Sequence, residues 1–254
     1  MSGSIQQAAA ILAACRSAVA LTGAGISVES GIPPFRGRGG LWEEIDPMKY
    51  AHINAYQKDP EAVWRVLFTR LNKVLEKARP NAGHAGLFQL EELGILKTVI
   101  TQNIDGLHQQ AGNRDVIEFH GTFASHSCMA CGRVVSSTRI SIEVLPPRCI
   151  CGGILRPDVI MFGELIPPDH LQRAQMLATT CDAMLVVGTS ATVQPAAYLP
   201  VIAKRGGAAI VEINPEPTPL TDRISDVTLL GKAGKILHEL VAAVEQLRPR
   251  LLRK

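Results

Sequence analysis

Five short apolar runs, each ending in glycine or a small polar residue, constrain the fold of this chain more than any other feature. They are AVALTG (18–23), LKTVITQN (96–103), AMLVVGTS (183–190), AAIVEIN (208–214) and DVTLLG (226–231). Runs that are continuous in Val, Ile and Leu are typical of parallel strands buried on both faces. Helix-like segments alternate with them, at about 4–15, 83–93, 169–180, 196–205 and 234–247. The alternation predicts an α/β fold with a Rossmann-like, doubly wound parallel sheet.

Two stretches, 35–80 and 121–156, interrupt this rhythm of strand and helix. We interpret them as insertions that together form a smaller domain. The large sheet is then assigned to residues 1–34, 81–120 and 157–254.

Composition and charge exclude several classes of protein. The chain has 254 residues, 46% of them hydrophobic, so it can bury a full core. Its net charge is only +3, and it has no block of five or six basic residues, so we expect neither nucleic acid nor membrane as a partner. The first apolar stretch has no basic residue before Arg16, unlike a secretory signal, and we expect a cytoplasmic protein. Nothing in the sequence predicts an oligomeric state.

Polar side chains follow a buried strand in TQNIDGLH (101–108), which delivers Gln102, Asn103 and Asp105 to its end. Burying an unpaired amide costs roughly 2–7 kcal/mol, so something polar must meet these groups. The motifs GAGIS, GTS and EIN also end predicted strands. Open α/β sheets bind ligands at the carboxyl ends of their strands, which predicts a ligand crevice at this edge.

A glycine pair in LTGAGISVESGIP (21–33) follows the first strand. Gly23 and Gly25 would let the backbone approach a diphosphate. However, Val28 replaces the third glycine of G-x-G-x-x-G, and no acidic residue ends a second strand about 20 positions on. An ordinary tight turn is therefore an equal alternative.

Four cysteines form a metal-binding pattern. C-x-x-C is followed, after an interval, by C-x-C, and the ligands would be Cys128, Cys131, Cys149 and Cys151. Four thiolates describe a closed tetrahedral zinc site with no position for a catalytic water, so the zinc should be structural. A redox dithiol is the minor alternative.

A candidate general base ends the strand-like run VIEFHGT (116–122). His120 would lie near the same crevice, and an imidazole titrates near neutrality. From the residue type alone, a structural histidine is equally possible.

The order of GAGIS, GIPPFRG, TQNIDGLHQQAG, FHG, the four cysteines, RPDVIMFGE, GTS and EIN closely resembles the sirtuin family of NAD-dependent protein deacylases. The resemblance covers about residues 5–245. The departures are Pro34, where many relatives carry Asp or Thr, and the C-x-C spacing. The resemblance implies that the large domain binds NAD, and that the smaller one combines a helical module with a zinc ribbon.

The resemblance also implies where NAD would lie along the sheet edge. The implied contacts are Gly23, Ala24, Gly25 and Ser27 at the diphosphate, Gly188, Thr189 and Ser190 along the phosphates and ribose, Asn214 at the adenosine ribose, Lys232 and Ala233 over the adenine, Gln102 and Asn103 at the nicotinamide ribose and an ordered water, Ile104 and Asp105 at the carboxamide, and Phe35 and Arg36 on a loop that closes the site.

In the implied reaction, the carbonyl oxygen of an acyl-lysine attacks C1′ of the ribose as nicotinamide leaves. His120 then deprotonates a ribose hydroxyl, which attacks the acyl carbon, with Gln102 and Asn103 beside it. The products would be deacylated lysine, nicotinamide and O-acyl-ADP-ribose. The peptide would add a strand between FGE (162–164) and VQPAAYL (193–199). The implied substrate residues are Leu67, Arg70, Val159, Phe162, Gly163, Glu164 and Val193.

Acyl choice is predicted from the segment 59–78, where Asp59 as N-cap and Pro60 begin a helix. In relatives that remove succinyl groups, a Tyr and an Arg three residues apart bind the acyl carboxylate. Arg70 matches that Arg, but Leu67 stands in place of the Tyr. We expect acetyl and longer apolar acyl groups to be preferred over succinyl. Arg70 could equally be a side chain that only borders the core.

Three other functions share some of these features. A dehydrogenase would use the same cofactor, but the acidic residue of the second strand is missing. A mono-ADP-ribosyltransferase would cleave the same bond and transfer ADP-ribose to a protein. A zinc-knuckle binding module would need a basic surface rich in aromatic residues, which the sequence does not indicate.

Overall fold

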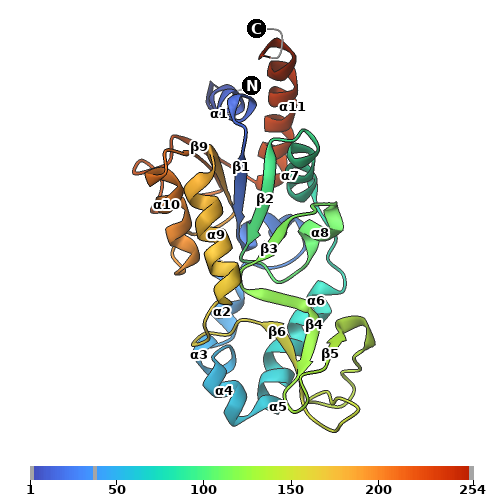
Figure 1. The fold of residues 1–254 in the computed structure, drawn as a ribbon. Helices are drawn as coiled ribbons and strands as arrows, with labels where there is room; N and C mark the ends of the chain where they lie inside the picture. Colours follow the sequence, from blue (N-terminus) through green and yellow to red (C-terminus); the bar gives the residue numbers. More distant parts are fainter. Residues whose placement is uncertain (1–2, 37–38, 252–254) are drawn as a thin grey trace.

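A six-stranded parallel sheet forms the centre of the larger part of the protein (Figure 1). The computed structural model describes residues 3–36 and 39–251, and their side chains to residue 248; residues 1–2, 37–38 and 252–254 of the predicted domain ranges lie outside it. The strand order is β3-β2-β1-β7-β8-β9. This is the order of a doubly wound dinucleotide-binding sheet, and the predicted fold class is confirmed. The strands are β1 (Ala18–Thr22), β2 (Leu96–Thr101), β3 (Val116–Glu118), β7 (Ala183–Val187), β8 (Ala209–Asn214) and β9 (Val227–Leu230).

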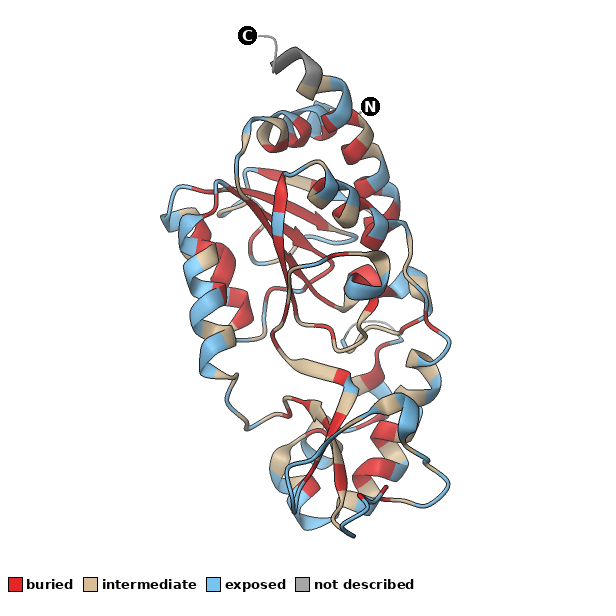
Figure 2. Ribbon diagram, turned by 45° about the vertical axis from the view of Figure 1, so that its right-hand side comes forward, coloured by how far each residue is buried: buried red, intermediate tan, exposed pale blue. Residues whose placement is uncertain are grey.

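Helices cover both faces of this sheet, as the continuous apolar strands predicted (Figure 2). Ala18 and Ala20 of β1 belong to the core under α1 (Gly3–Ala14), α7 (Ala82–Glu92) and α11 (Ala233–Leu251). Val19 and Leu21 point to the opposite core, under α9 (Pro168–Thr180) and α10 (Leu199–Arg205). Alternate residues of one strand therefore support two separate helical layers. Within residues 3–36 and 39–251, no helix is both long and apolar enough to cross a bilayer.

The two insertions share one apolar core. Tyr56, Trp64 and Phe68 of the first insertion pack with Phe123 of the second and with Val159. The smaller module also contains an antiparallel sheet in the order β5-β4-β6, whose strand β6 continues past residue 156, the predicted end of the second insertion, to Val159. The elements are α2 (Leu41–Glu44), α3 (Pro47–Tyr50), α4 (Ile53–Lys58), α5 (Pro60–Val63), α6 (Thr69–Leu75), β4 (Gly121–Cys128), β5 (Val134–Ser136), the 3₁₀ turn η3 (Ser137–Arg139) and β6 (Leu155–Val159).

The helix predicted in segment 59–78 begins as expected but is not regular. Asp59 caps it by accepting a hydrogen bond from the Ala62 N–H at 2.9 Å. A π-helical segment, η2 (Trp64–Phe68), then separates α5 from α6. The Thr69 hydroxyl donates to the Trp64 carbonyl at 2.9 Å across this wider turn. π segments are rare and often lie at functional sites, and this one places Leu67 and Phe68 on the wall of the main cavity.

Candidate active site

A cavity of about 1040 Å³ lies along the carboxyl ends of the parallel strands and extends to the smaller module. Its lining includes Gly23 after β1, Gln102 after β2, His120 after β3 and Asn214 at the end of β8. The cavity therefore lies at the sheet edge that the sequence predicted.

Most of the predicted cofactor and substrate residues line this cavity. They are Gly23, Ala24, Gly25, Phe35, Arg36, Leu67, Gln102, Asn103, Ile104, His120, Val159, Phe162, Gly163, Glu164, Gly188, Thr189, Ser190, Val193, Asn214, Lys232 and Ala233. Among the described residues, three predicted ones are not part of the lining: Ser27, Asp105 and Arg70.

Gly23 and Gly25 are required by the packing of two loops. A Cβ on Gly25 would lie 2.7 Å from the Gly188 Cα, and one on Gly23 would lie 2.8 Å from the Gly188 carbonyl oxygen. The Gly25 N–H donates to that same oxygen at 2.8 Å. Gly188 itself has a φ of 61°, which favours glycine. The turn after β1, η1 (Ala24–Ser30), is thus held directly against the loop that follows β7.

Protein groups satisfy the Asn103 amide. Its Nδ2 donates to the Gly23 carbonyl at 3.2 Å and to Ser27 Oγ at 3.0 Å. The Ser27 hydroxyl in turn donates to Asp105 Oδ2 at 2.7 Å, and Asp105 Oδ1 accepts from the Leu107 N–H at the start of α8 (Leu107–Ala111). The polar partners that the sequence required for this amide are therefore supplied by the protein itself. Ser27 and Asp105 hold Asn103 from behind the cavity wall.

His120 is held in one tautomer by the strand end next to it. Its Nδ1 lies 3.1 Å from the Gln102 carbonyl oxygen. A carbonyl can only accept, so Nδ1 carries the proton and Nε2 keeps a free lone pair. Burial lowers the pKa of His120 below its usual 6.5, and the bond to Gln102 opposes this only partly. The site therefore holds a neutral imidazole with an available basic nitrogen.

Asn214 is also fixed in orientation. Its Nδ2 donates to the Glu216 carbonyl at 3.1 Å and to the Thr189 carbonyl at 3.4 Å. These bonds leave Oδ1 as an acceptor suited to a hydroxyl group. Gln102 is tied to the same loop, because its Nε2 donates to Thr189 Oγ1 at 3.0 Å.

An apolar end of the cavity was missed by the sequence reasoning. Trp42 lines it, stacks on Phe35 with ring centroids 5.3 Å apart and lies 6.3 Å from the Phe162 ring. Phe68, Leu71 and Met161 belong to the same lining. The available signal was the concentration of aromatic residues in segment 35–68, which the sequence reasoning did not use.

Arg70 is not part of this lining. Its guanidinium forms an ion pair with Glu44 at 2.6 Å, and the Arg70 side chain is 42% exposed. The pair lies on the outside of the helical insertion.

The four cysteines fit a zinc ion. Their Sγ atoms all lie within 4.8 Å of one another, and the Cys128–Cys151 and Cys131–Cys149 distances are 3.5 and 3.8 Å. A tetrahedron with Zn–S bonds of about 2.3 Å requires S···S distances of about 3.8 Å. Backbone N–H groups of Cys131 and Ala130 lower the pKa of the Cys128 thiol to about 6, which favours the thiolate that binds metal.

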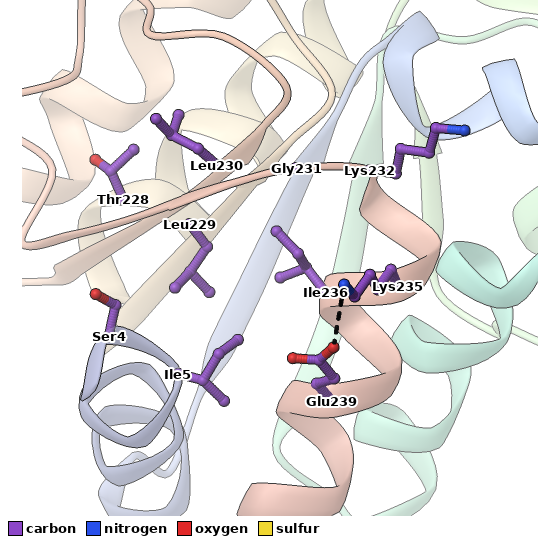
Figure 3. Close-up of a pocket in the computed structure, with 10 residues that line it drawn as sticks. All are labelled: Ser4, Ile5, Thr228, Leu229, Leu230, Gly231, Lys232, Lys235, Ile236 and Glu239. Atoms are coloured by element: carbon purple, nitrogen blue, oxygen red, sulfur yellow. Dashed lines mark ion pairs between the residues drawn. The ribbon is translucent and has the colours of Figure 1, made fainter. Parts of the chain in front are cut away.

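A second, smaller cavity of about 250 Å³ lies between α1, β9 and α11 (Figure 3). Its lining shares Gly231 and Lys232 with the main cavity. Lys235 forms an ion pair with Glu239 at 4.0 Å, on the exposed side of this cavity. Lys232, one of the two residues predicted to cover the adenine, is common to both cavities, whereas Ala233 lines only the main one.

Comparison with known proteins gives one consistent result. A family model described as "Sir2 family" matches residues 23–195. The chain is 49% identical over 237 residues to the NAD-dependent protein deacylase 2 of Pyrobaculum aerophilum, covering 93% of this chain and 94% of that protein.

Two solved structures have the same fold. A Sir2 homologue in complex with NAD has a TM-score of 0.87 at 46% identity, covering 96% of this chain and 94% of the other. Sir2Af2 bound to a myristoylated histone peptide has a TM-score of 0.81 at 39% identity, and the match covers 98% of this chain and 100% of the other. Together with the strand order, the cavity and the cysteine cluster, these similarities confirm the predicted relationship, and the chain belongs to the Sir2 family.

Proposed function

We propose that this chain is an NAD-dependent protein-lysine deacylase that produces nicotinamide and O-acyl-ADP-ribose. The observation that carries this proposal is the neutral His120, with its Nδ1 bonded to the Gln102 carbonyl, in a cavity large enough for a dinucleotide and an acyl-lysine. The activity in the name of the Pyrobaculum aerophilum relative supports it.

NAD, when bound, supplies an ADP-ribosyl group whose C1′ accepts the acyl carbonyl oxygen as nicotinamide leaves. His120 Nε2 then takes a proton from a ribose hydroxyl, because Nδ1 is already committed to Gln102. The Asn103 amide lines the same cavity in a fixed orientation. Phe35, stacked on Trp42, closes the apolar side of the site and helps to exclude water.

We propose the predicted NAD contacts for those residues that line the cavity. Gly188, Thr189 and Ser190 would meet the phosphates, and the Oδ1 of Asn214 would accept from the adenosine ribose. For Ser27 and Asp105, which were predicted to contact NAD but do not line the cavity, we propose an indirect role through Asn103. The Glu216 and Thr189 carbonyls would also act indirectly, because they accept hydrogen bonds from Asn214 and so orient its side chain toward the ribose.

The preferred acyl groups are apolar. Leu67 is buried in the cavity wall beside Phe68, and neither side chain can bind a carboxylate. Arg70, which could do so, is paired with Glu44 outside the lining. We propose acetyl and longer alkyl acyl groups as substrates in preference to succinyl. The myristoylated peptide bound by Sir2Af2 is consistent with this choice.

The remaining assignments stay predictions. We propose the domain division at residues 34–35, 80–81, 120–121 and 156–157, a structural role for zinc, an extended acyl-lysine peptide as partner, and a cytoplasmic location.

Incubation with NAD and an acetyl-lysine peptide tests the function. We expect one nicotinamide and one O-acetyl-ADP-ribose for each lysine deacetylated, identified by mass. ADP-ribose attached to the protein or peptide, with the acetyl group intact, would instead support a mono-ADP-ribosyltransferase.

A further inference from the structure

Glu164, predicted to contact substrate, turns its carboxylate toward another protein side chain. Oε1 accepts a hydrogen bond from Arg156 Nη1 at 2.8 Å, and Oε2 accepts from Arg156 Nη2. Oε2 also accepts from the Met161 N–H at 2.8 Å. The Arg156 and Glu164 side chains are only 19% and 22% exposed, so the pair is mostly shielded from water. The carboxylate is therefore committed to the protein.

Arg156 connects three parts of the molecule. It lies in β6, which pairs with the zinc-ribbon strand β4. Its Nη2 also donates to the Val159 carbonyl at 2.8 Å. Its guanidinium lies 5.7 Å from the centre of the Tyr56 ring, which belongs to α4 of the helical insertion.

The segment that the pair holds, 159–164, forms part of the cavity wall. The Ile160 N–H donates to the His120 carbonyl at 2.8 Å, so the segment is joined directly to the proposed general base. Phe162 exchanges two backbone hydrogen bonds with the helical insertion: its N–H donates to the Ala51 carbonyl at 2.9 Å, and its carbonyl accepts from the Ile53 N–H at 3.0 Å. The Arg156–Glu164 pair fixes the Val159 and Met161 backbone between these attachments.

We infer that Arg156 and Glu164 are positioning residues for the acyl-lysine peptide, an inference that rests on the proposed function. An extended peptide that adds a strand depends on backbone N–H and C=O groups held in register. A bidentate Arg–carboxylate pair imposes such geometry more strictly than a single point charge. Loss of either partner leaves a shielded charge unpaired and removes the contacts that hold the backbone of segment 159–164. The peptide would then have to bind to a backbone that is no longer preorganised, which weakens its binding.

Three variants test this inference. Glu164→Gln keeps the size of the side chain but removes its charge, and Arg156→Lys keeps the charge but loses the two-pronged contact. Glu61→Gln, in the exposed ion pair with Arg65, is the matched control. The readouts are the Kd of a fluorescent acetyl-lysine peptide, the Kd of NAD, the zinc content and the circular dichroism spectrum.

We expect the peptide Kd to rise about tenfold to a hundredfold in Glu164→Gln and in Arg156→Lys, the scale of losing one hydrogen bond to a charged group. The Kd of NAD should stay within about twofold, since the cofactor contacts lie on other loops. An unchanged peptide Kd in both variants would overturn the inference, as would an equal loss of peptide and NAD binding. If Glu164→Gln does not fold, the inference is tested by Arg156→Lys alone, because that variant keeps both charges. The positioning role is judged only from the peptide Kd of each variant relative to that of the unmodified protein. The proposed function is tested separately, by turnover of the unmodified protein.

Discussion

At the scale of single residues, the site depends on side chains whose protons and orientations are fixed by backbone groups. The Gln102 carbonyl sets the tautomer of His120, and the Glu216 and Thr189 carbonyls set the orientation of Asn214. In each case a strand end or loop supplies the fixed acceptor. The chemistry therefore follows from the sheet edge that holds these residues.

Replacement of His120 by Ala should abolish deacylation while NAD still binds. Removing a general base typically reduces the rate about 10²- to 10⁴-fold, and the proposed NAD contacts lie on other residues. His238→Ala, on the exposed side of α11, is the control and should retain full activity. Turnover and the Kd of NAD are the measurements. Near-normal turnover by a folded His120→Ala protein would contradict the assignment.

The pH dependence of kcat/KM should show an acidic limb below pH 6.5. Burial lowers the pKa of His120, so the neutral base persists to a lower pH than a free histidine would allow. Activity is then fully present above pH 6.5 and declines as the pH falls through the lowered pKa. An acidic limb centred above pH 7 would show that another group controls the rate.

Replacement of Leu67 by Tyr should increase desuccinylation relative to deacetylation. A hydrogen bond to a charged group contributes about 1.5–3 kcal/mol, or roughly tenfold to a hundredfold in kcat/KM. Matched acetyl- and succinyl-lysine peptides provide the measurement. The increase should be larger when Glu44→Gln is added, because Arg70 is then released from its ion pair. A preference of the unmodified protein for succinyl would contradict the proposed acyl choice.

At the scale of elements, the strands were predictable and several details were not. Each strand of the large sheet lies within a predicted apolar run or within the strand-like run at 116–122, because burial on both faces imposes one composition. The π segment Trp64–Phe68 was not predictable, since it depends on tertiary packing around Tyr56 and Phe123. The same holds for the pairs Arg70–Glu44 and Arg156–Glu164, which join separate elements. Local pattern thus predicted the position of the site, and long-range contacts decided which side chains reach it.

Replacement of Cys149 by Ser should release zinc and unfold or aggregate the protein. Structural zinc sites contribute on the order of 10–16 kcal/mol to folding in isolated peptides, and Cys149 is buried in the ribbon core with Cys128 and Leu155. Metal content by mass spectrometry and the urea midpoint are the measurements. Cys15→Ser, at a cysteine that packs against the core of the large sheet, is the control and should keep its zinc. A soluble, fully active Cys149→Ser protein would contradict the structural role.

At the scale of the whole molecule, two titratable side chains are buried where α7 and α8 meet. His84 of α7 and His108 of α8 lie with ring centroids 4.9 Å apart beneath η1. Burial lowers the pKa of His84 to about 4 and that of His108 to about 3, while Asp105 opposes the shift at His84. Both imidazoles are therefore neutral in the folded protein at neutral pH.

These histidines predict acid sensitivity. Because an unfolded histidine has a pKa of about 6.5, the stability they provide is present above pH 6.5 and is lost as the pH falls toward 4. Each should add about 1.4 kcal/mol per pH unit to the slope of the unfolding free energy in this window. Urea titrations at several pH values measure the slope. His108→Gln should reduce it, and an unchanged slope would contradict the account.

The central claim is that the acyl group passes to the ribose of NAD and is not hydrolysed directly. A peptide whose acetyl carbonyl carries ¹⁸O distinguishes the two, because that oxygen attacks C1′ in the proposed reaction. We predict that the label appears on C1′ of the O-acetyl-ADP-ribose and that the acetyl group gains one oxygen from water. Label retained in free acetate, with NAD unconsumed, would contradict the proposed function directly.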